Sequence, residues 1–273
     1  MRLYLAGIEG KTEMFDEAKP PYILFSFASA QGGSKKSEKI MNSVRSPYCK
    51  DYLLDSGAFT FFTKGHSKTM AEWDRYVDAY IDFINTWNVH HFFELDIDRI
   101  VGLEKVEEFR RRIESKTGKQ SIPVWHSNRG WQYFVNMCKE YNYVSIGGIA
   151  KNPNGKAIEK IFPWFIQEAH RTGTQIHGLG YTDTKKLKQY PFDSVDSTSW
   201  SSGGRYGVTF ELKGNAMCGR RISTPTKSST VSLSTFTTSR CGHNMQNHLT
   251  TERSTKTYEN LLKRQWHHSH EIP

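Results

Sequence analysis

Three aspartates come near the ends of apolar runs of the sequence: Asp55, Asp96 and Asp196. Because the carboxyl ends of parallel strands meet at one edge of a sheet, we expect these carboxylates to converge. One such aspartate alone would be explained as a helix cap or a turn former. Three of them can divide the work at a glycosidic centre, where one carboxylate attacks the anomeric carbon and another handles the proton.

Other polar residues and several glycines occupy the same strand-end positions. Glycine lets a ligand approach backbone N–H and C=O groups closely, and an aromatic ring can stack on a flat ligand. The pattern therefore predicts a pocket for a flat heterocycle. Its candidate substrate-binding residues are Ser56, Gly57, Phe59, Asp96, Asp98, His126, Gly147, Gly148, Gly178 and Gly180.

Short apolar runs alternate with helical patterns along residues 1–213, as expected for β/α units around a parallel sheet. The runs are Arg2–Gly7, Tyr22–Phe27, Asp51–Gly57, His90–Asp98, Ser121–His126, Tyr143–Ile149, Gln175–Gly180 and Ser194–Trp200. The helices that we expect between them are Ser37–Val44, Met70–Trp87, Leu103–Thr117, Arg129–Tyr141, Gly155–Arg171 and Thr182–Gln189. Eight such units predict an α/β fold, a (β/α)8 TIM-type barrel, with a doubly wound open sheet as the alternative.

Composition limits the class of protein. A hydrophobic content of 37% and a charged content of 24% are typical of a soluble globular chain. No apolar run approaches the roughly 20 residues of a membrane span, so we expect no membrane partner. Four widely spaced cysteines favour a reducing compartment. We therefore expect a cytoplasmic protein, in the host cytoplasm if it is phage-encoded.

The net charge of +9 favours a polyanionic partner, and the charge is concentrated near the C-terminus. Residues 214–273 hold 8 of the 37 Lys and Arg but only 3 of the 28 Asp and Glu, together with 18 Ser and Thr. This composition predicts an irregular or disordered basic segment that follows the barrel of residues 1–213 and could contact phosphates.

The order of these motifs resembles the tRNA-guanine transglycosylase superfamily, and most of all its short phage-type members, which exchange guanine for a 7-deazaguanine in DNA. The resemblance covers about residues 50–210. It rests on Asp55-Ser56-Gly57-Ala58-Phe59, Leu95-Asp96, His126, Ile146-Gly147-Gly148-Ile149-Ala150, Gly178-Leu179-Gly180 and Asp196-Ser197-Thr198-Ser199-Trp200.

The resemblance implies a role for each matching residue. Asp55 would assist proton transfer at the base, and Phe59 would stack on the heterocycle. Asp96 would accept hydrogen bonds from N1–H and the exocyclic amine of guanine. His126 stands where the family usually has Gln, and the Gly147-Gly148 backbone would meet the edge of the ligand.

The family's nucleophile is an aspartate of the last strand, and two residues here compete for it. Phe192-Asp193-Ser194-Val195 resembles one branch of the family and Asp196-Ser197-Thr198-Ser199-Trp200 another. We favour Asp196, which lies further into the apolar run, and keep Asp193 as the alternative. Arg205 matches a loop that contacts the nucleic-acid backbone.

The resemblance further implies a nucleic-acid acceptor, with DNA favoured over tRNA, and a 7-deazaguanine base such as preQ0. We expect no cofactor and no metal. The C-terminal zinc site of the larger relatives has no counterpart, because Cys241-Gly242-His243 and His267-His268-Ser269-His270 do not supply four ligands at a recognisable spacing.

Two other classes of function remain open at this stage. The barrel could be a metal-dependent hydrolase of a small molecule, with Asp96, Asp98 and His126 as ligands, although it lacks the His-x-His pair that usually anchors such a site. The chain could also be a non-catalytic nucleic-acid-binding protein. That interpretation uses the charge and leaves the carboxylates unexplained.

Overall fold

The computed structural model describes residues 1–31, 33–57, 68–148, 155–181, 183, 186–187, 189–198, 208–213 and 216–221, the last two ranges and residues 155–156 by their backbone alone. Phe59 and Arg205 lie outside these residues, so their predicted roles concern parts of the chain that are not described. Among the helices in the described ranges, none combines the length and the apolar character that a membrane span requires.

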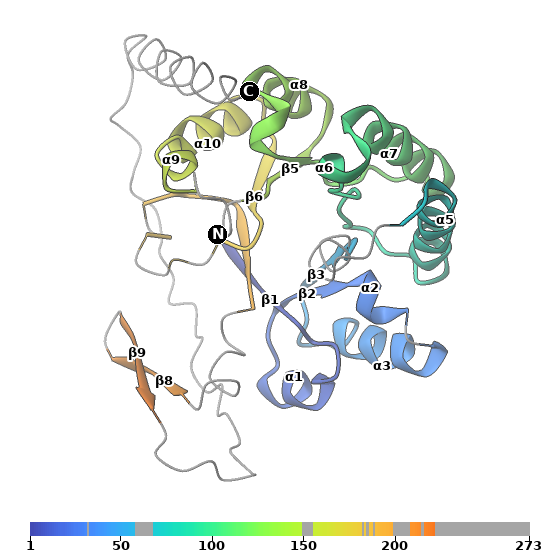
Figure 1. Cartoon of the computed structure of the whole chain (residues 1–273). Helices are drawn as coiled ribbons and strands as arrows, with labels where there is room; N and C mark the ends of the chain where they lie inside the picture. Colours follow the sequence, from blue (N-terminus) through green and yellow to red (C-terminus); the bar gives the residue numbers. More distant parts are fainter. Residues whose placement is uncertain are drawn as a thin grey trace.

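Seven parallel strands form one sheet. They are β1 (Arg2–Ala6), β2 (Tyr22–Ser26), β3 (Asp51–Asp55), β4 (Val124–Trp125), β5 (Tyr143–Ile146), β6 (Gln175–Gly178) and β7 (Ser194–Ser197). Their order is β3-β2-β1-β7-β6-β5-β4, so the first strand pairs with the last. This order follows the chain around a circle, whereas a doubly wound sheet reverses its order at a switch point. The predicted α/β class is confirmed, and the sheet curls as Figure 1 shows.

Residues 92–93 lie between the two edges of this sheet. Leu54 of β3 forms a parallel bridge with Phe92, and Phe93 forms one with Ile122, two residues before β4. The run His90–Asp98, predicted as a strand, thus contributes isolated bridges to both edges and is not one of the seven strands.

Helices lie on the outer side of the curled sheet (Figure 1). Their bounds are α1 (Thr12–Ala18), α2 (Phe27–Ala30), α3 (Ser34–Val44), α5 (Met70–Thr86), α6 (Asp98–Val101), α7 (Leu103–Thr117), α8 (Trp131–Glu140), α9 (Gly155–Glu159) and α10 (Phe162–Arg171). A 3-10 turn, η1 (Ser127–Arg129), precedes α8. The strongest helix prediction is confirmed by α5, which buries the expected stripe and starts with a capping box between Thr69 and Glu72.

Two helix predictions need correction, and α1, α2 and α6 were not predicted. The segment Gly155–Arg171 is two helices, because Pro163 lies in the first turn of α10, where its missing N–H is tolerated, and would break a continuous helix. The described residues of Thr182–Gln189 form no helix. The sequence analysis missed α1, whose buried residues are only Thr12 and Phe15, too few to give a period.

Alternate strand residues enter different hydrophobic clusters. Tyr4, Leu24, Leu53, Phe93 and Val124 belong to a cluster made only of residues from the strands and from residues 93 and 122. Their chain neighbours pack with helix residues in two other clusters. Because neighbouring strand residues point to opposite faces, the first cluster fills the concave face and the helices cover the convex one.

A separate antiparallel hairpin consists of β8 (Val208–Lys213) and β9 (Ala216–Arg221). The predicted boundary between the residues 1–213 and the basic segment falls between these two strands.

The ends of β2 and β3 pack so closely that only glycine fits between them at one position. Gly57 has a φ of +74°, and an added Cβ would lie 2.6 Å from Ser26 Oγ and 2.7 Å from the backbone nitrogen of Ala28. Ala28 belongs to the first turn of α2, so its backbone nitrogen cannot move aside as a flexible side-chain end can. Gly57 therefore fixes how the turn after β3 lies against β2.

We expect Gly57→Ala to lower the free energy of unfolding by more than about 2 kcal/mol, through left-handed backbone and overpacking together. Gly10→Ala is the matched control, because Gly10 has a φ of +79° with no atom within 4 Å of an added Cβ. It should cost only about 1 kcal/mol. Urea unfolding of both variants measures the difference, and equal losses would show that the close contact at Gly57 is relieved without cost.

Candidate active site

The three predicted carboxylates meet at one end of the sheet. Asp55 ends β3, Asp96 follows the bridging residues 92–93, and Asp196 lies in the last half of β7. Burial raises the pKa of Asp55 well above its usual range, and the charges of Asp96 and Asp196 raise it further. Because charges affect a pKa mainly at short range, Asp96 and Asp196 lie near Asp55 at this end of the sheet.

Asp55 therefore holds its proton more tightly than an ordinary aspartate. Its carboxyl group accepts a hydrogen bond from the backbone N–H of Gly57, which opposes the rise in pKa only in part. A carboxyl group whose pKa is raised in this way is suited to act as a general acid toward a leaving group.

Asp196 is hydrogen-bonded through one of its two carboxylate oxygens. Its Oδ1 accepts a hydrogen bond from the backbone N–H of Gly180 at 2.5 Å and lies 3.2 Å from Nε2 of His177. Both contacts use Oδ1, and the residue is buried. Gly180 thus contributes its backbone to the site, as predicted for a strand-end glycine.

Asp193 lies elsewhere. It precedes β7, and its Oδ2 accepts from the backbone N–H of Ile176 at 2.8 Å and lies 3.0 Å from His170 Nε2 of α10. Its side chain stays 32% exposed. The structure brings Asp196 to the other two carboxylates and leaves Asp193 at the start of the strand.

Asp96 and Asp98 have contrasting surroundings. Asp98 receives Nδ1 of His126 at 2.7 Å, Nδ2 of Asn128 at 2.6 Å and Nη2 of Arg129 at 3.0 Å. Burial alone would raise the pKa of Asp98, but the hydrogen bond from His126 and the charge of Arg129 hold it well below its usual range. Asp98 is therefore saturated with donors from the protein.

Asp96 has few donors. Ser56 Oγ lies 3.5 Å from its Oδ1, and His126 Nε2 lies 4.0 Å from its Oδ2. Burial raises the pKa of Asp96, and the nearby His126 opposes that rise. A buried carboxylate with long contacts is suited to accept hydrogen bonds from a ligand.

His126 connects these two aspartates. The ionised Asp98 only accepts hydrogen bonds, so Nδ1 of His126 carries the proton and Nε2 faces Asp96. The ring also explains a pair of glycines: a Cβ on Gly147 would lie 2.8 Å from His126 Nε2, and one on Gly148 would lie 3.3 Å from Cδ2. Gly147 and Gly148 therefore make room for His126 at the site.

Gly178, another predicted ligand-binding glycine, faces away from the site. An added Cβ would lie 3.3 Å from Val195, 3.4 Å from Tyr181 and 3.5 Å from Phe192, all of which pack in the cluster between sheet and helices. Alternation along β6 places His177 on the concave face and Gly178 on the convex one.

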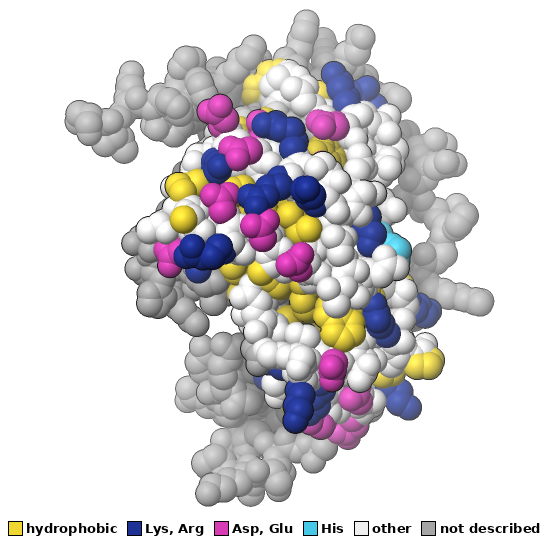
Figure 2. All heavy atoms as spheres, turned by 90° about the vertical axis from the view of Figure 1, so that its right-hand side faces the viewer, with side chains coloured by type: hydrophobic (Ala, Val, Ile, Leu, Met, Phe, Trp, Pro, Cys, Tyr) yellow, Lys and Arg dark blue, Asp and Glu magenta, His cyan; other side chains and the backbone are white. Residues whose placement is uncertain are grey.

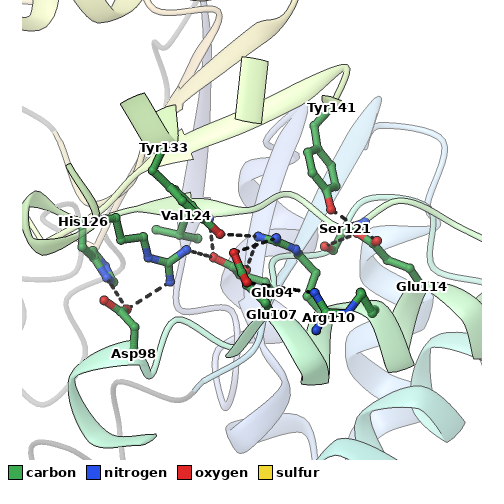
Figure 3. Close-up of polar contacts among 12 residues, drawn as sticks. Glu94, Asp98, Glu107, Arg110, Glu114, Ser121, Val124, His126, Tyr133 and Tyr141 are labelled. Atoms are coloured by element: carbon green, nitrogen blue, oxygen red, sulfur yellow. Dashed lines mark hydrogen bonds and ion pairs between the residues drawn. The ribbon is translucent and has the colours of Figure 1, made fainter. Parts of the chain in front are cut away.

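A buried ionic network supports His126 and Asp98 from behind (Figure 3). Its centre is Glu94, whose carboxylate accepts from Arg129 Nη1 at 2.6 Å, from Arg110 Nη1 at 3.0 Å and from the backbone N–H of Val124 at 2.8 Å. The side chains of Glu94 and Arg129 are fully buried and that of Arg110 is 7% exposed. Burial disfavours both guanidinium charges, yet the charge of Glu94 raises the pKa of each.

Sequence reasoning missed this network. The sequence predicts a solvated helix face for the charged run Arg110-Arg111-Arg112, but the side chain of Arg110 is buried. Arg110 lies four residues after Val106 and three before Ile113 on the buried stripe of α7, and this spacing was the available signal. Arg112 instead pairs with Asp74 and Asp78 of α5.

Glu9 is a further carboxylate that sequence reasoning missed. It follows β1 as the predicted aspartates follow their strands, its Oε1 accepts a hydrogen bond from the backbone N–H of Ser26, and its charge also raises the pKa of Asp55. Burial raises the pKa of Glu9 itself. The strand-end rule applied to β1 would have found it.

The geometry does not favour a metal centre. Among the described residues, no group of three or more His, Cys, Asp and Glu side chains is placed to hold a metal ion. Of the three ligands considered for a hydrolase, Asp98 is already bonded to Arg129 and to His126, so a cation would have to replace a guanidinium.

No protein-family model matches the chain, and the search of curated proteins found no match either.

Removing the charge of Glu94 should be costly for stability. Glu94→Gln removes the nearest anion of the buried Arg110 and one of the two anions of the buried Arg129, and we expect the free energy of unfolding to fall by about 3–5 kcal/mol. Glu107→Gln is the matched control, because Glu107 approaches the same Arg110 at 3.9 Å from a partly exposed position. It should cost at most about 1 kcal/mol. Urea unfolding compares them, and similar losses would mean that the network does not stabilise the fold.

The raised pKa of Asp55 fixes the sign of a pH effect. The folded protein keeps a proton on Asp55 at pH values where the unfolded chain has lost it, so Asp55 makes stability fall as pH rises from the unfolded pKa toward the folded one. Asp55→Asn removes this loss. The free energy of unfolding of the variant, relative to that of the parent protein, should therefore increase as pH rises from the unfolded pKa to the folded one, by about 1.4 kcal/mol for each pKa unit between them.

Asp98→Asn should change the pH dependence of stability in the opposite direction. The lowered pKa of Asp98 stabilises the fold above the unfolded pKa, and that stability is lost as pH falls. Thermal unfolding measures the two trends, above about pH 4 for Asp55→Asn and below it for Asp98→Asn, because the unfolded pKa of an aspartate is about 3.9. A stability difference for Asp55→Asn that shrinks with rising pH would contradict the protonated state assigned to this carboxyl group.

Proposed function

We propose that this protein is a base-exchange glycosyltransferase of the tRNA-guanine transglycosylase superfamily. It replaces guanine in nucleic acid, with DNA favoured over tRNA, by a 7-deazaguanine base such as preQ0. The observation that carries the proposal is the meeting of Asp55, Asp96 and Asp196 in three different environments. Asp55 has a raised pKa, Asp96 has a long contact to Ser56 Oγ, and Asp196 is hydrogen-bonded to Gly180 through its Oδ1.

The proposal includes closure of the sheet into an eight-stranded (β/α)8 barrel. Residues 90–98 take the place of the remaining strand, between β3 and β4. The bridges of Phe92 and Phe93 to the two edges support this closure, as does the order of the seven strands around a circle. In such a barrel the reactive residues lie at the carboxyl ends of the strands.

Asp196 is the nucleophile in this reaction. Its free oxygen, Oδ2, forms a bond to C1′ of the nucleotide sugar, while the C1′–N9 bond breaks and its electron pair goes to guanine. Asp55 donates a proton to the departing base. The incoming 7-deazaguanine then attacks C1′, the C1′–Oδ2 bond breaks, and the proton lost by the new base returns to Asp55.

Asp96 selects the base. Its carboxylate accepts hydrogen bonds from N1–H and the exocyclic amine of guanine, which add to the long contact from Ser56 Oγ. His126 lies beside it, with its ring fixed by Asp98. The exchange balances atoms and charge without an oxidant or a reductant, so the proposal needs no cofactor.

The face formed by α5 and α7 is not assigned to binding of the nucleic acid. Figure 2 shows Lys and Arg interspersed with Asp and Glu there, and Arg112 is already paired with Asp74 and Asp78. Contacts to phosphate are assigned to Arg205 and to the basic segment 214–273, both outside the residues whose side chains are described. We therefore expect the affinity for the nucleic acid to fall as the salt concentration rises, while the affinity for the free base stays unchanged.

The test is formation of a covalent adduct. The full chain is incubated with guanine-containing duplex DNA, and separately with tRNA, and the adduct is detected on a denaturing gel beside uptake of labelled guanine. We expect Asp196→Asn to reduce both signals at least ~10³-fold, because the nucleophile is lost.

Asp193→Asn is the matched control, one residue before the same strand, and it should retain the adduct. Loss of the adduct in Asp193→Asn with retention in Asp196→Asn would reverse the assignment of the nucleophile. No adduct and no uptake of label by the parent protein with either polymer would reject the proposed function.

A further inference from the structure

On the concave side of the sheet, a line of hydrogen bonds links side chains of three neighbouring strands and ends at Asp196. Tyr143 of β5 bonds through its hydroxyl to Ser194 Oγ of β7. Ser194 Oγ lies 2.6 Å from His177 Nδ1 of β6, and His177 Nε2 lies 3.2 Å from Asp196 Oδ1. The side chain of His177 is fully buried.

The chemistry of the groups gives this line a direction. An ionised Asp196 can only accept, so Nε2 of His177 donates to it. In the neutral Nε2–H tautomer, Nδ1 has a lone pair that accepts the hydroxyl proton of Ser194. Burial raises the pKa of the Tyr143 hydroxyl to about 12, so Tyr143 keeps its proton and donates to Ser194.

Aromatic rings leave His177 little freedom to turn. Its ring centroid lies 5.3 Å from that of Phe93, 6.1 Å from that of Tyr4 and 6.4 Å from that of Tyr143. With both ring nitrogens bonded as well, the orientation of the imidazole is determined from all sides. A side chain fixed in this way can fix its neighbour.

We propose that His177 is the positioning residue for the nucleophile: its Nε2–H, together with the backbone N–H of Gly180, holds Oδ1 of Asp196 and thereby aims Oδ2 at the anomeric carbon. Ser194 and Tyr143 set the tautomer of the imidazole. This inference rests on the proposed function. During the attack the Oδ2–C1′ bond forms and the C1′–N9 bond breaks, while His177 keeps its proton and continues to donate to Oδ1.

Two substitutions of His177 separate positioning from packing. His177→Leu fills similar space without a donor, whereas His177→Gln places an amide N–H near the position of Nε2. We expect His177→Leu to slow adduct formation about 10²-fold, the cost of a misplaced reacting group, and His177→Gln to recover most of that loss. Affinity for free guanine should stay within about twofold in both, because Asp96 is untouched.

Substitutions further along the line give a graded series. Ser194→Ala removes the partner of Nδ1 and should slow adduct formation about tenfold, and Tyr143→Phe should slow it less, since it acts through Ser194. Tyr141→Phe is the matched control, because the Tyr141 hydroxyl lies 3.4 Å from Glu114, in another part of the molecule. Equal rates for His177→Leu and the parent protein, or no recovery in His177→Gln, would overturn the proposal.

A second measurement does not depend on activity. Long-range ¹H–¹⁵N correlation spectra of the full chain report which nitrogen of His177 carries the proton, with His177→Gln used to assign the signal. We expect the Nε2–H form in the parent protein and a mixture of tautomers in Ser194→Ala. The Nδ1–H form in the parent protein would overturn the positioning role even if adducts form. Absence of any adduct in the parent protein with the Nε2–H form present would reject the proposed function, while the predicted hydrogen-bond line would stand.

Discussion

The side chain of Glu94 is fully buried, and Glu94 directly follows residues 92–93, which lie between the two edges of the sheet. Three donors satisfy it, from Arg110 of α7, from Arg129 of η1 and from the backbone of β4. Removing any of these charges from water is costly, and their mutual attraction repays that cost only while the geometry is maintained. Residues 92–98, the outer helix and the end of β4 are therefore constrained to one arrangement.

That constraint extends into the candidate site through Arg129. Its second guanidinium nitrogen bonds Asp98, Asp98 orients His126, and His126 faces Asp96. Glu94 and Asp98 each accept hydrogen bonds from three protein groups. Asp96 at the end of the series has described side-chain contacts at 3.5 Å from Ser56 Oγ and 4.0 Å from His126 Nε2. The network thus provides rigid support behind the site and leaves accepting capacity where a ligand can use it.

The concave side of the sheet combines apolar packing with a few buried polar groups. Phe93, Leu24 and Leu53 exclude water there, while Ser194 and His177 are bonded to each other and to their neighbours. In surroundings of low polarity a satisfied network is rigid, because an unpaired donor would be expensive. The same surroundings disfavour a charge on Asp55: burial and two neighbouring carboxylates raise its pKa and favour the protonated form.

The sequence by itself determined the elements and the edge at which chemistry gathers. Period and apolar runs predicted α5 and α7 and most of the strands, and the strand-end rule found Asp55, Asp96 and Asp196, because these patterns reflect local geometry and which face is buried. Only the tertiary structure decided the rest. It separated Asp196 from Asp193, turned Gly178 outward, buried Arg110 beside Glu94 and placed His177 under Asp196. The physical reason is that hydrogen bonds and charge pairs join residues far apart in the chain, and no local period encodes which donor meets which carboxylate.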